Sequence, residues 1–146
     1  MLAFRTSGLL MAATVASIGF ATMAAAPARA PVLAALGLLE PGQWQLTEQS
    51  NAPSRLTQRI CVGDAAALLQ VRHAGASCLR YVIENEAKHG TVHYTCPGAG
   101  HGRTTIRVET PRLVRIDSQG IADNAPFEFV LEGRRIGPCP TGMARH

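Results

Sequence analysis

The sequence lacks the short motifs that most directly identify a catalytic or metal site. No Gly-x-Ser-x-Gly nucleophile motif occurs, and no His-x-x-x-His pair contains the glutamate of helical zinc proteases. The four cysteines include no Cys-x-x-Cys pair, which structural zinc sites usually contain. We therefore expect no catalytic residues, no metal and no cofactor, and we predict a non-enzymatic protein.

Four histidines nevertheless need an interpretation: His73, His89, His93 and His101. His89 and His93 are four residues apart, but on a strand such residues lie about 13 Å apart, which is too far for one metal ion. The glycine-rich segment 97–102 has the composition of a phosphate-binding loop, yet a strand pattern follows it instead of a helix. We expect solvated or hairpin histidines, and a long hairpin loop at the glycine-rich segment.

Charge is sparse, and it argues against a nucleic-acid partner. Of the 146 residues, 16% are charged and 47% are hydrophobic, which excludes general disorder. From Pro31 onward there are twelve basic and ten acidic residues, a charge of only about +2. Arg103, Arg107, Arg112 and Arg115 do gather in one stretch, where we expect a solvated sheet face. Contact with anionic lipid or polysaccharide is the alternative.

The N-terminus has the pattern of a secretory signal peptide. One arginine is followed by an apolar run from Leu9 to Met23, and then by small residues. The run is shorter than the ~20 residues that span a bilayer, and no second long apolar segment follows. We predict a signal peptide over 1–28, with cleavage between 24 and 30. Residues 29–146 would then form one periplasmic or secreted domain without stable membrane insertion.

The remainder of the chain alternates apolar and polar residues between glycine, proline and asparagine boundaries, which predicts a mainly β fold. The short loops indicate one antiparallel meander, curled into a half-barrel or barrel. Asp64 can cap a short helix near 64–71, and a helical turn near 33–37 precedes the strands. About seven strands are expected, at 42–49, 55–62, 78–85, 91–96, 103–109, 113–119 and 126–135.

Two hairpins can be aligned by their apolar residues. Around the turn 110–112, a three-residue loop places Ile106 opposite Ile116 and Val108 opposite Val114. In the hairpin before it, the alternation predicts that Leu79, Tyr81 and Ile83 form the buried face of their strand. The strand 126–135 is expected to turn Phe127, Phe129 and Leu131 inward.

The four cysteines, Cys61, Cys78, Cys96 and Cys139, are expected to form two disulfides in an oxidising compartment. Strand alternation places Cys61 and Cys78 on the outer face, and Cys96 and Cys139 on the inner face. We therefore favour Cys61–Cys78 with Cys96–Cys139. A single β-bulge in the hairpin would instead allow Cys78–Cys96 with Cys61–Cys139.

An ordered set of segments resembles the bacterial exported family called domain of unknown function family 3617. After the signal segment come Pro41–Trp44, Arg59–Cys61 with its helical stretch, Cys78, Tyr94–Cys96 with its glycine-rich loop, and Gly133–Cys139. The resemblance spans nearly all of the exported part. It implies export and disulfides, and no activity.

A second resemblance is to calycin barrels such as lipocalins, which carry a Gly-x-Trp on the first strand. Gly42 and Trp44 match that pattern, and Arg134 or Arg135 would supply the arginine that covers the tryptophan. We expect all four residues to be structural, with Trp44 in the core. The resemblance implies binding of a small apolar or envelope-derived ligand. The alternative is a protein-interaction module similar to periplasmic protease inhibitors, which bind through an extended N-terminal segment, here residues 31–39.

Overall fold

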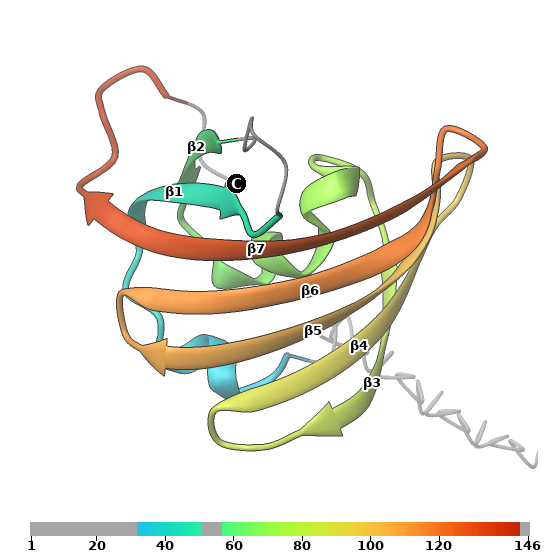
Figure 1. The fold of residues 1–146 in the computed structure, drawn as a ribbon, viewed down its shortest axis with the longest axis horizontal. Helices are drawn as coiled ribbons and strands as arrows, with labels where there is room; N and C mark the ends of the chain where they lie inside the picture. The colour runs from blue at the N-terminus through green and yellow to red at the C-terminus, as the bar shows by residue number, and fades with distance from the viewer. Residues whose placement is uncertain (1–31, 51–56, 144–146) are drawn as a thin grey trace, which may run out of the picture.

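The computed structural model describes residues 32–50 and 57–143 (Figure 1). The predicted signal peptide and its cleavage region lie outside these residues. The described chain is mainly β, as predicted, with seven antiparallel strands in one sheet. The strands are β1 (Gly42–Glu48), β2 (Thr57–Val62), β3 (Leu79–Asn85), β4 (His89–Cys96), β5 (Gly100–Thr110), β6 (Leu113–Ala122) and β7 (Ala125–Gly137).

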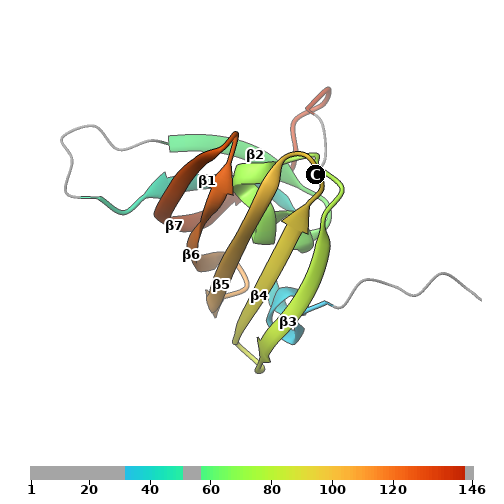
Figure 2. The same cartoon turned by 90° about the vertical axis from the view of Figure 1, so that its right-hand side faces the viewer.

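The sheet is strongly curved but stays open, which corresponds to the half-barrel alternative (Figures 1 and 2). Its strand order is β2-β1-β7-β6-β5-β4-β3. Strands β3 to β7 form a consecutive meander, and the β1–β2 pair joins it because β1 pairs with β7. β2 and β3 are thus the two edges, although they are neighbours in sequence.

Two short 3₁₀ helices cover one face of the sheet, which we call the inner face. They are η1 (Ala34–Leu38) and η2 (Ala65–His73), close to the two expected helical segments. Leu36 of η1 and Leu68 and Leu69 of η2 are buried in the same cluster as Trp44. Because Leu33, Leu36 and Leu39 are buried and Ala34–Leu38 is helical, residues 33–39 pack on the core through these leucines and do not form an extended arm.

The β5–β6 hairpin has the predicted alignment. Ile106 pairs with Ile116 and Val108 pairs with Val114, and all four side chains are buried. Apolar residues on the same face of a local hairpin select the register, because a slip by one residue would expose them all.

The predicted buried face of β3 is wrong. A β-bulge between Val82 and Glu84 shifts the β3–β4 register by one residue, so that Val82 faces Val92 on the inner side. Leu79, Tyr81 and Ile83 are consequently 75%, 71% and 47% exposed. A bulge inserts an extra residue into one strand and thereby exchanges its faces beyond that point.

The same bulge overturns the favoured disulfide pairing. The bonds are Cys78–Cys96 and Cys61–Cys139, which is the alternative pairing, in place of Cys61–Cys78 and Cys96–Cys139. The shifted register brings Cys78 and Cys96 to a Cα–Cα distance of 4.2 Å. Cys139 follows the end of β7, so strand alternation does not determine the direction of its side chain.

Trp44 lies in the core, with 0% of its surface exposed, and its Nε1 donates a hydrogen bond to the carbonyl of Glu40 at 3.1 Å. Opposite it on β7 stands Arg135, whose Nε donates to the carbonyl of Pro41 at 2.8 Å. Gly42 has a positive φ of 147°, and a Cβ there would lie 2.7 Å from Arg135 Nε. Arg134 instead forms a surface ion pair with Glu132.

Candidate functional site

A pocket of about 340 Å³ lies between the two edge strands of the sheet. Its walls come from β2, from η2 and the loop after it, and from β3. Most of the lining residues are apolar, and the remaining ones are one arginine and two glutamines. We call it the edge pocket. Its lining residues are Gln58, Ile60, Ala67, Gln70, Val71, Ala74, Gly75, Ala76 and Arg80.

The sequence of η2 explains how a glutamine reaches the inside of the protein. Asp64 caps the helix, because its carboxylate accepts a hydrogen bond from the Ala66 amide at 2.9 Å. The helix kinks at Gln70, whose φ of −137° and ψ of 42° are not helical. At this kink the Gln70 side chain is only 6% exposed.

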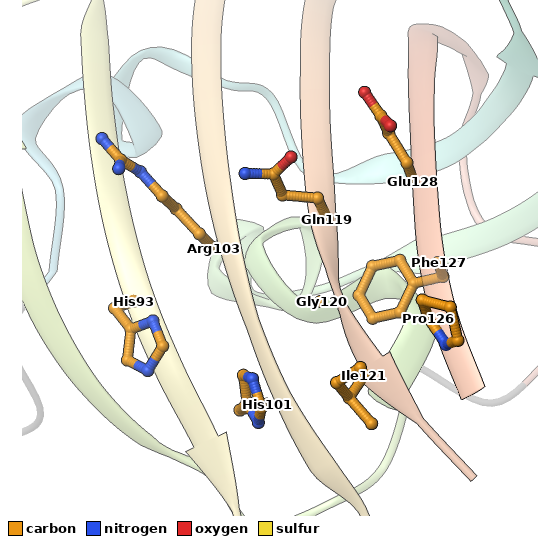
Figure 3. Close-up of a pocket in the computed structure, with 9 residues that line it drawn as sticks. All are labelled: His93, His101, Arg103, Gln119, Gly120, Ile121, Pro126, Phe127 and Glu128. Carbon is orange, nitrogen blue, oxygen red and sulfur yellow. The ribbon is translucent and has the colours of Figure 1, made fainter. Parts of the chain in front are cut away.

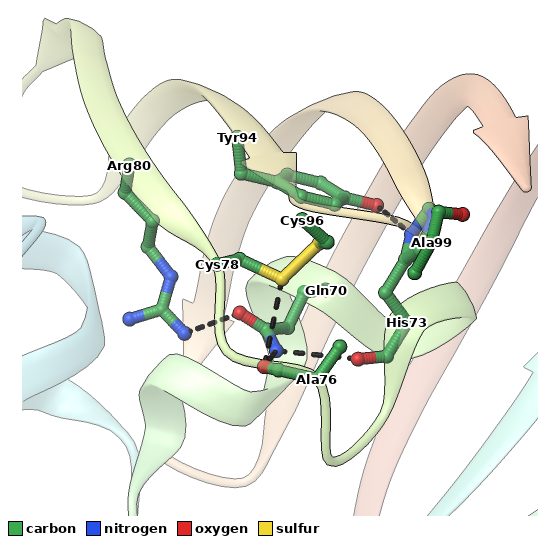
Figure 4. Close-up of a disulfide and its surroundings, with 8 residues drawn as sticks. All are labelled: Gln70, His73, Ala76, Cys78, Arg80, Tyr94, Cys96 and Ala99. Carbon is green, nitrogen blue, oxygen red and sulfur yellow. Dashed lines mark hydrogen bonds between the residues drawn. A yellow bond between two sulfur atoms is a disulfide. The ribbon is translucent and has the colours of Figure 1, made fainter.

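Gln70 links the loop after η2 to strand β3 (Figure 4). Its Nε2 donates to the carbonyl oxygens of His73 at 3.2 Å and Ala76 at 2.9 Å. These two bonds orient the amide, and its Oε1 accepts a hydrogen bond from Arg80 Nη2 at 2.6 Å. The Arg80 guanidinium is therefore held in one position at the wall of the edge pocket.

Arg80 has no carboxylate partner among the described residues. Five other arginines lie within 4.0 Å of a carboxylate: Arg72, Arg112, Arg115, Arg134 and Arg135. Arg59, Arg103 and Arg107 have no such partner, but they are exposed to water. Arg80 is half-buried, and its Nε atom is buried without any hydrogen-bond partner. A cation in this position is unusual, because burial of charge is costly without compensation.

His73 and Tyr94 form a hydrogen-bonded pair beside this pocket (Figure 4). His73 Nε2 lies 3.1 Å from the carbonyl of Ala99, which can only accept, so Nε2 carries the proton. Nδ1 then accepts from the Tyr94 hydroxyl at 3.1 Å. Burial raises the pKa of Tyr94, which keeps this hydroxyl protonated. Both ring nitrogens are engaged, and the pair ties η2 to strand β4 and to the turn that follows it.

A second hollow, the apolar groove, adjoins the edge pocket and has a volume of about 530 Å³. The two hollows share Gln58 and Val71 as lining residues. In the groove the rings of Phe127 and Phe129 stack with their centroids 5.6 Å apart. Its lining residues are Leu46, Glu48, Thr57, Gln58, Val71, Arg72, Phe127, Glu128, Phe129 and Leu131.

Figure 3 shows a third hollow, of about 600 Å³, beside strands β4 to β7. Arg103 is its one basic residue and Glu128 its one acidic residue, and the rings of His93 and His101 also line it. The rings of His93 and His101 have centroids 5.9 Å apart. Both residues are exposed, in agreement with the expectation of solvated histidines.

The other histidine and loop predictions have mixed outcomes. His73 is 5% exposed, so the expectation of a solvated side chain is wrong there. His89 is a hairpin histidine, as expected: it begins β4 after the β3–β4 turn, is half-buried and lies 3.3 Å from a carboxylate oxygen of Glu84. The glycine-rich stretch is no long loop, because β4 ends at Cys96 and β5 begins at Gly100. Within residues 32–50 and 57–143, no three or more histidine, cysteine or acidic side chains are grouped as metal ligands.

The arginine-rich stretch forms a solvated surface, as expected. Arg103, Arg107 and Arg115 are exposed on adjacent strands, and Arg112 in the turn pairs with Glu40 at 2.9 Å. Arg115 is neutralised by Asp117 at 3.2 Å.

Sequence reasoning missed Gln70 and Arg80, two of the three polar residues of the edge pocket; the third is Gln58. The alternation that predicts a buried face of Leu79 and Tyr81 places Arg80, between them, on the outer face. One signal was present: pairing Cys78 with Cys96 places Arg80 opposite the inward Tyr94. For Gln70 the signal was weaker, a polar residue near the end of an apolar helical stretch.

Comparisons with known proteins do not assign the chain to a family. No protein-family model, curated protein or solved structure matches the chain. Among the described residues, no helix is both long and apolar enough to cross a membrane. The resemblances to family 3617 and to calycin barrels therefore stay predictions.

Proposed function

We propose that this chain is an exported bacterial protein, periplasmic or secreted, that binds a small apolar ligand without transforming it. The ligand site is the edge pocket together with the apolar groove. The observation that carries the proposal is that the two hollows adjoin, since Gln58 and Val71 line both. A largely apolar hollow of several hundred Å³ with a few convergent polar groups is typical of small-molecule sites.

Two features support the location outside the cytoplasm. All four cysteines are in disulfides, which persist mainly in oxidising compartments. The N-terminal sequence has the signal-peptide pattern. Membership of family 3617 would agree with both, and it is part of the proposal.

The test uses Nile red, an uncharged apolar dye whose fluorescence rises in apolar surroundings. We expect saturable binding to the wild-type chain. Val71→Trp would fill the junction of the two hollows and weaken dye binding severalfold. Leu79→Trp is the matched control, because Leu79 is 75% exposed on the opposite face of the sheet. Dye binding that is absent, or that Val71→Trp leaves unchanged, would contradict the proposal.

A protein-interaction module is the second candidate, and edge strand β3 favours it. Leu79, Tyr81 and Ile83 are large, exposed and adjacent along an unpaired sheet edge. Native proteins usually protect such edges with charge or proline, so an exposed apolar edge indicates a contact surface. Gel filtration of the wild type and Tyr81→Lys would detect self-association through this edge.

A further inference from the structure

We propose that the ligand of the edge pocket is a monoanionic amphiphile, a carboxylate on an apolar chain, and that Arg80 binds its carboxylate. This inference rests on the proposed function and adds the chemistry of the ligand's head group. It begins from the one half-buried arginine of the described chain that has no carboxylate partner.

The charge of Arg80 requires an anion. An arginine side chain stays protonated in proteins, so this guanidinium cannot become neutral to relieve its burial. Gln70 Oε1 occupies one N–H group, at 2.6 Å, but an amide oxygen carries no net charge. The Nε–H group is buried and has no acceptor. An anion in the pocket can reach the guanidinium only through its Nη atoms, because Nε is buried, and there it would supply the missing charge.

The shape of the guanidinium selects a carboxylate. Its N–H groups form a planar fork that matches the two oxygens of a carboxylate. Within the described residues Arg80 is the only cationic residue lining the edge pocket. One cation compensates one negative charge, whereas a phosphate monoester would bring an excess of negative charge into a partly apolar site.

The site is organised before the ligand arrives. Gln70 is oriented by its two bonds to the carbonyls of His73 and Ala76, so its oxygen is fixed toward Arg80. The Cys78–Cys96 disulfide fixes the backbone two residues before Arg80. A preorganised donor loses little conformational freedom on binding.

The remaining walls fit the apolar chain. Ile60, Ala67 and Val71 line the same pocket as Arg80, and Val71 also borders the apolar groove. A ligand with its head group at Arg80 would extend along η2 toward Phe127 and Phe129. Its polar end and its apolar end would each meet matching surface.

The experiment compares dodecanoate with dodecanol, which has the same chain and no charge, by isothermal titration calorimetry below their aggregation concentrations. We expect the wild type to bind dodecanoate about tenfold more tightly or better, because charge-assisted hydrogen bonds are the stronger ones. Arg80→Met, which keeps the apolar stem, should abolish this preference and leave dodecanol binding unchanged. Arg80→Lys keeps the charge without the fork and should retain only part of the preference.

The matched control is Arg107→Gln, which removes an exposed and unpaired arginine from the sheet. It should bind both compounds as the wild type does. Equal affinity of the wild type for the two compounds would overturn the assignment of Arg80 and leave the proposed function standing. Binding of neither compound, together with no binding of Nile red, would overturn both. If Arg80→Met does not fold, the relative affinity of the wild type for dodecanoate and dodecanol still tests the preference for a carboxylate.

Discussion

The Tyr94 hydroxyl donates a hydrogen bond to His73 Nδ1 at 3.1 Å, and this bond joins strand β4 to helix η2. The two residues are 21 positions apart in sequence, and their rings meet edge to face with centroids 5.4 Å apart. The contact holds in place the helix that forms one wall of the edge pocket.

Loss of the Tyr94 hydroxyl should destabilise the fold. Tyr94→Phe keeps the ring but leaves His73 Nδ1 without its donor, and an unsatisfied buried acceptor costs about 1–3 kcal/mol. Tyr81→Phe is the control and should change the free energy of unfolding by less than about 0.5 kcal/mol, because Tyr81 is 71% exposed. Urea unfolding measures both. Equal effects of the two substitutions would contradict the assigned role of the pair.

Tyr94 should also make stability depend on alkaline pH. Burial raises its pKa above the ordinary value of 10.0, an effect that hydrogen bonds with Ser118 and Thr104 partly offset. The folded state then holds the proton more tightly than the unfolded state. Its contribution is complete below about pH 10 and is lost as the pH rises toward the folded-state pKa. The wild type should therefore lose more stability than Tyr94→Phe between about pH 9 and pH 11, as measured by urea unfolding.

Gln70→Leu should destabilise the protein by about 1–3 kcal/mol, because the carbonyls of His73 and Ala76 lose their shared donor. Gln119→Leu, on the exposed surface of β6, should be nearly neutral. Thermal unfolding followed by circular dichroism compares the two variants. A neutral Gln70→Leu would show that water replaces the amide.

Trp44→Ala should have the largest effect of any single truncation. The side chain is fully buried, and removal of a buried tryptophan typically costs about 3–5 kcal/mol. That is a large share of the 5–15 kcal/mol that stabilises an ordinary domain. We expect loss of the cooperative thermal transition or a strong decrease in its midpoint. An unchanged midpoint would place Trp44 outside the core.

The two disulfides should contribute unequally. Cys61–Cys139 joins residues 78 apart in sequence, whereas Cys78–Cys96 joins residues 18 apart. In the chain-entropy description, replacing the first pair by serine costs about 4–5 kcal/mol and replacing the second about 3 kcal/mol. Denaturant unfolding of the two double variants tests this order. Non-reducing peptide mapping independently tests the pairing, and a peptide joining Cys61 to Cys78 would contradict it.

The sequence alone predicted register and burial correctly where the deciding residues are close along the chain. Ile106 and Val108 face Ile116 and Val114 across a tight turn, so apolar alternation and turn length together leave one register. The burial of Trp44 likewise follows from its place in an alternating strand beside Leu46. In both cases the residues that decide the outcome are close in sequence or obey the strand period.

Only the tertiary structure decided the faces of β3, the disulfide pairing and the composition of the edge pocket. The bulge between Val82 and Glu84 turns Arg80 inward, and one inserted residue leaves no mark in the apolar alternation. The pocket then depends on β2 and β3 becoming the two edges of the sheet, which follows from the pairing of β1 with β7, about 90 residues away. Such long-range contacts are selected by packing of the whole core, and no local pattern encodes them.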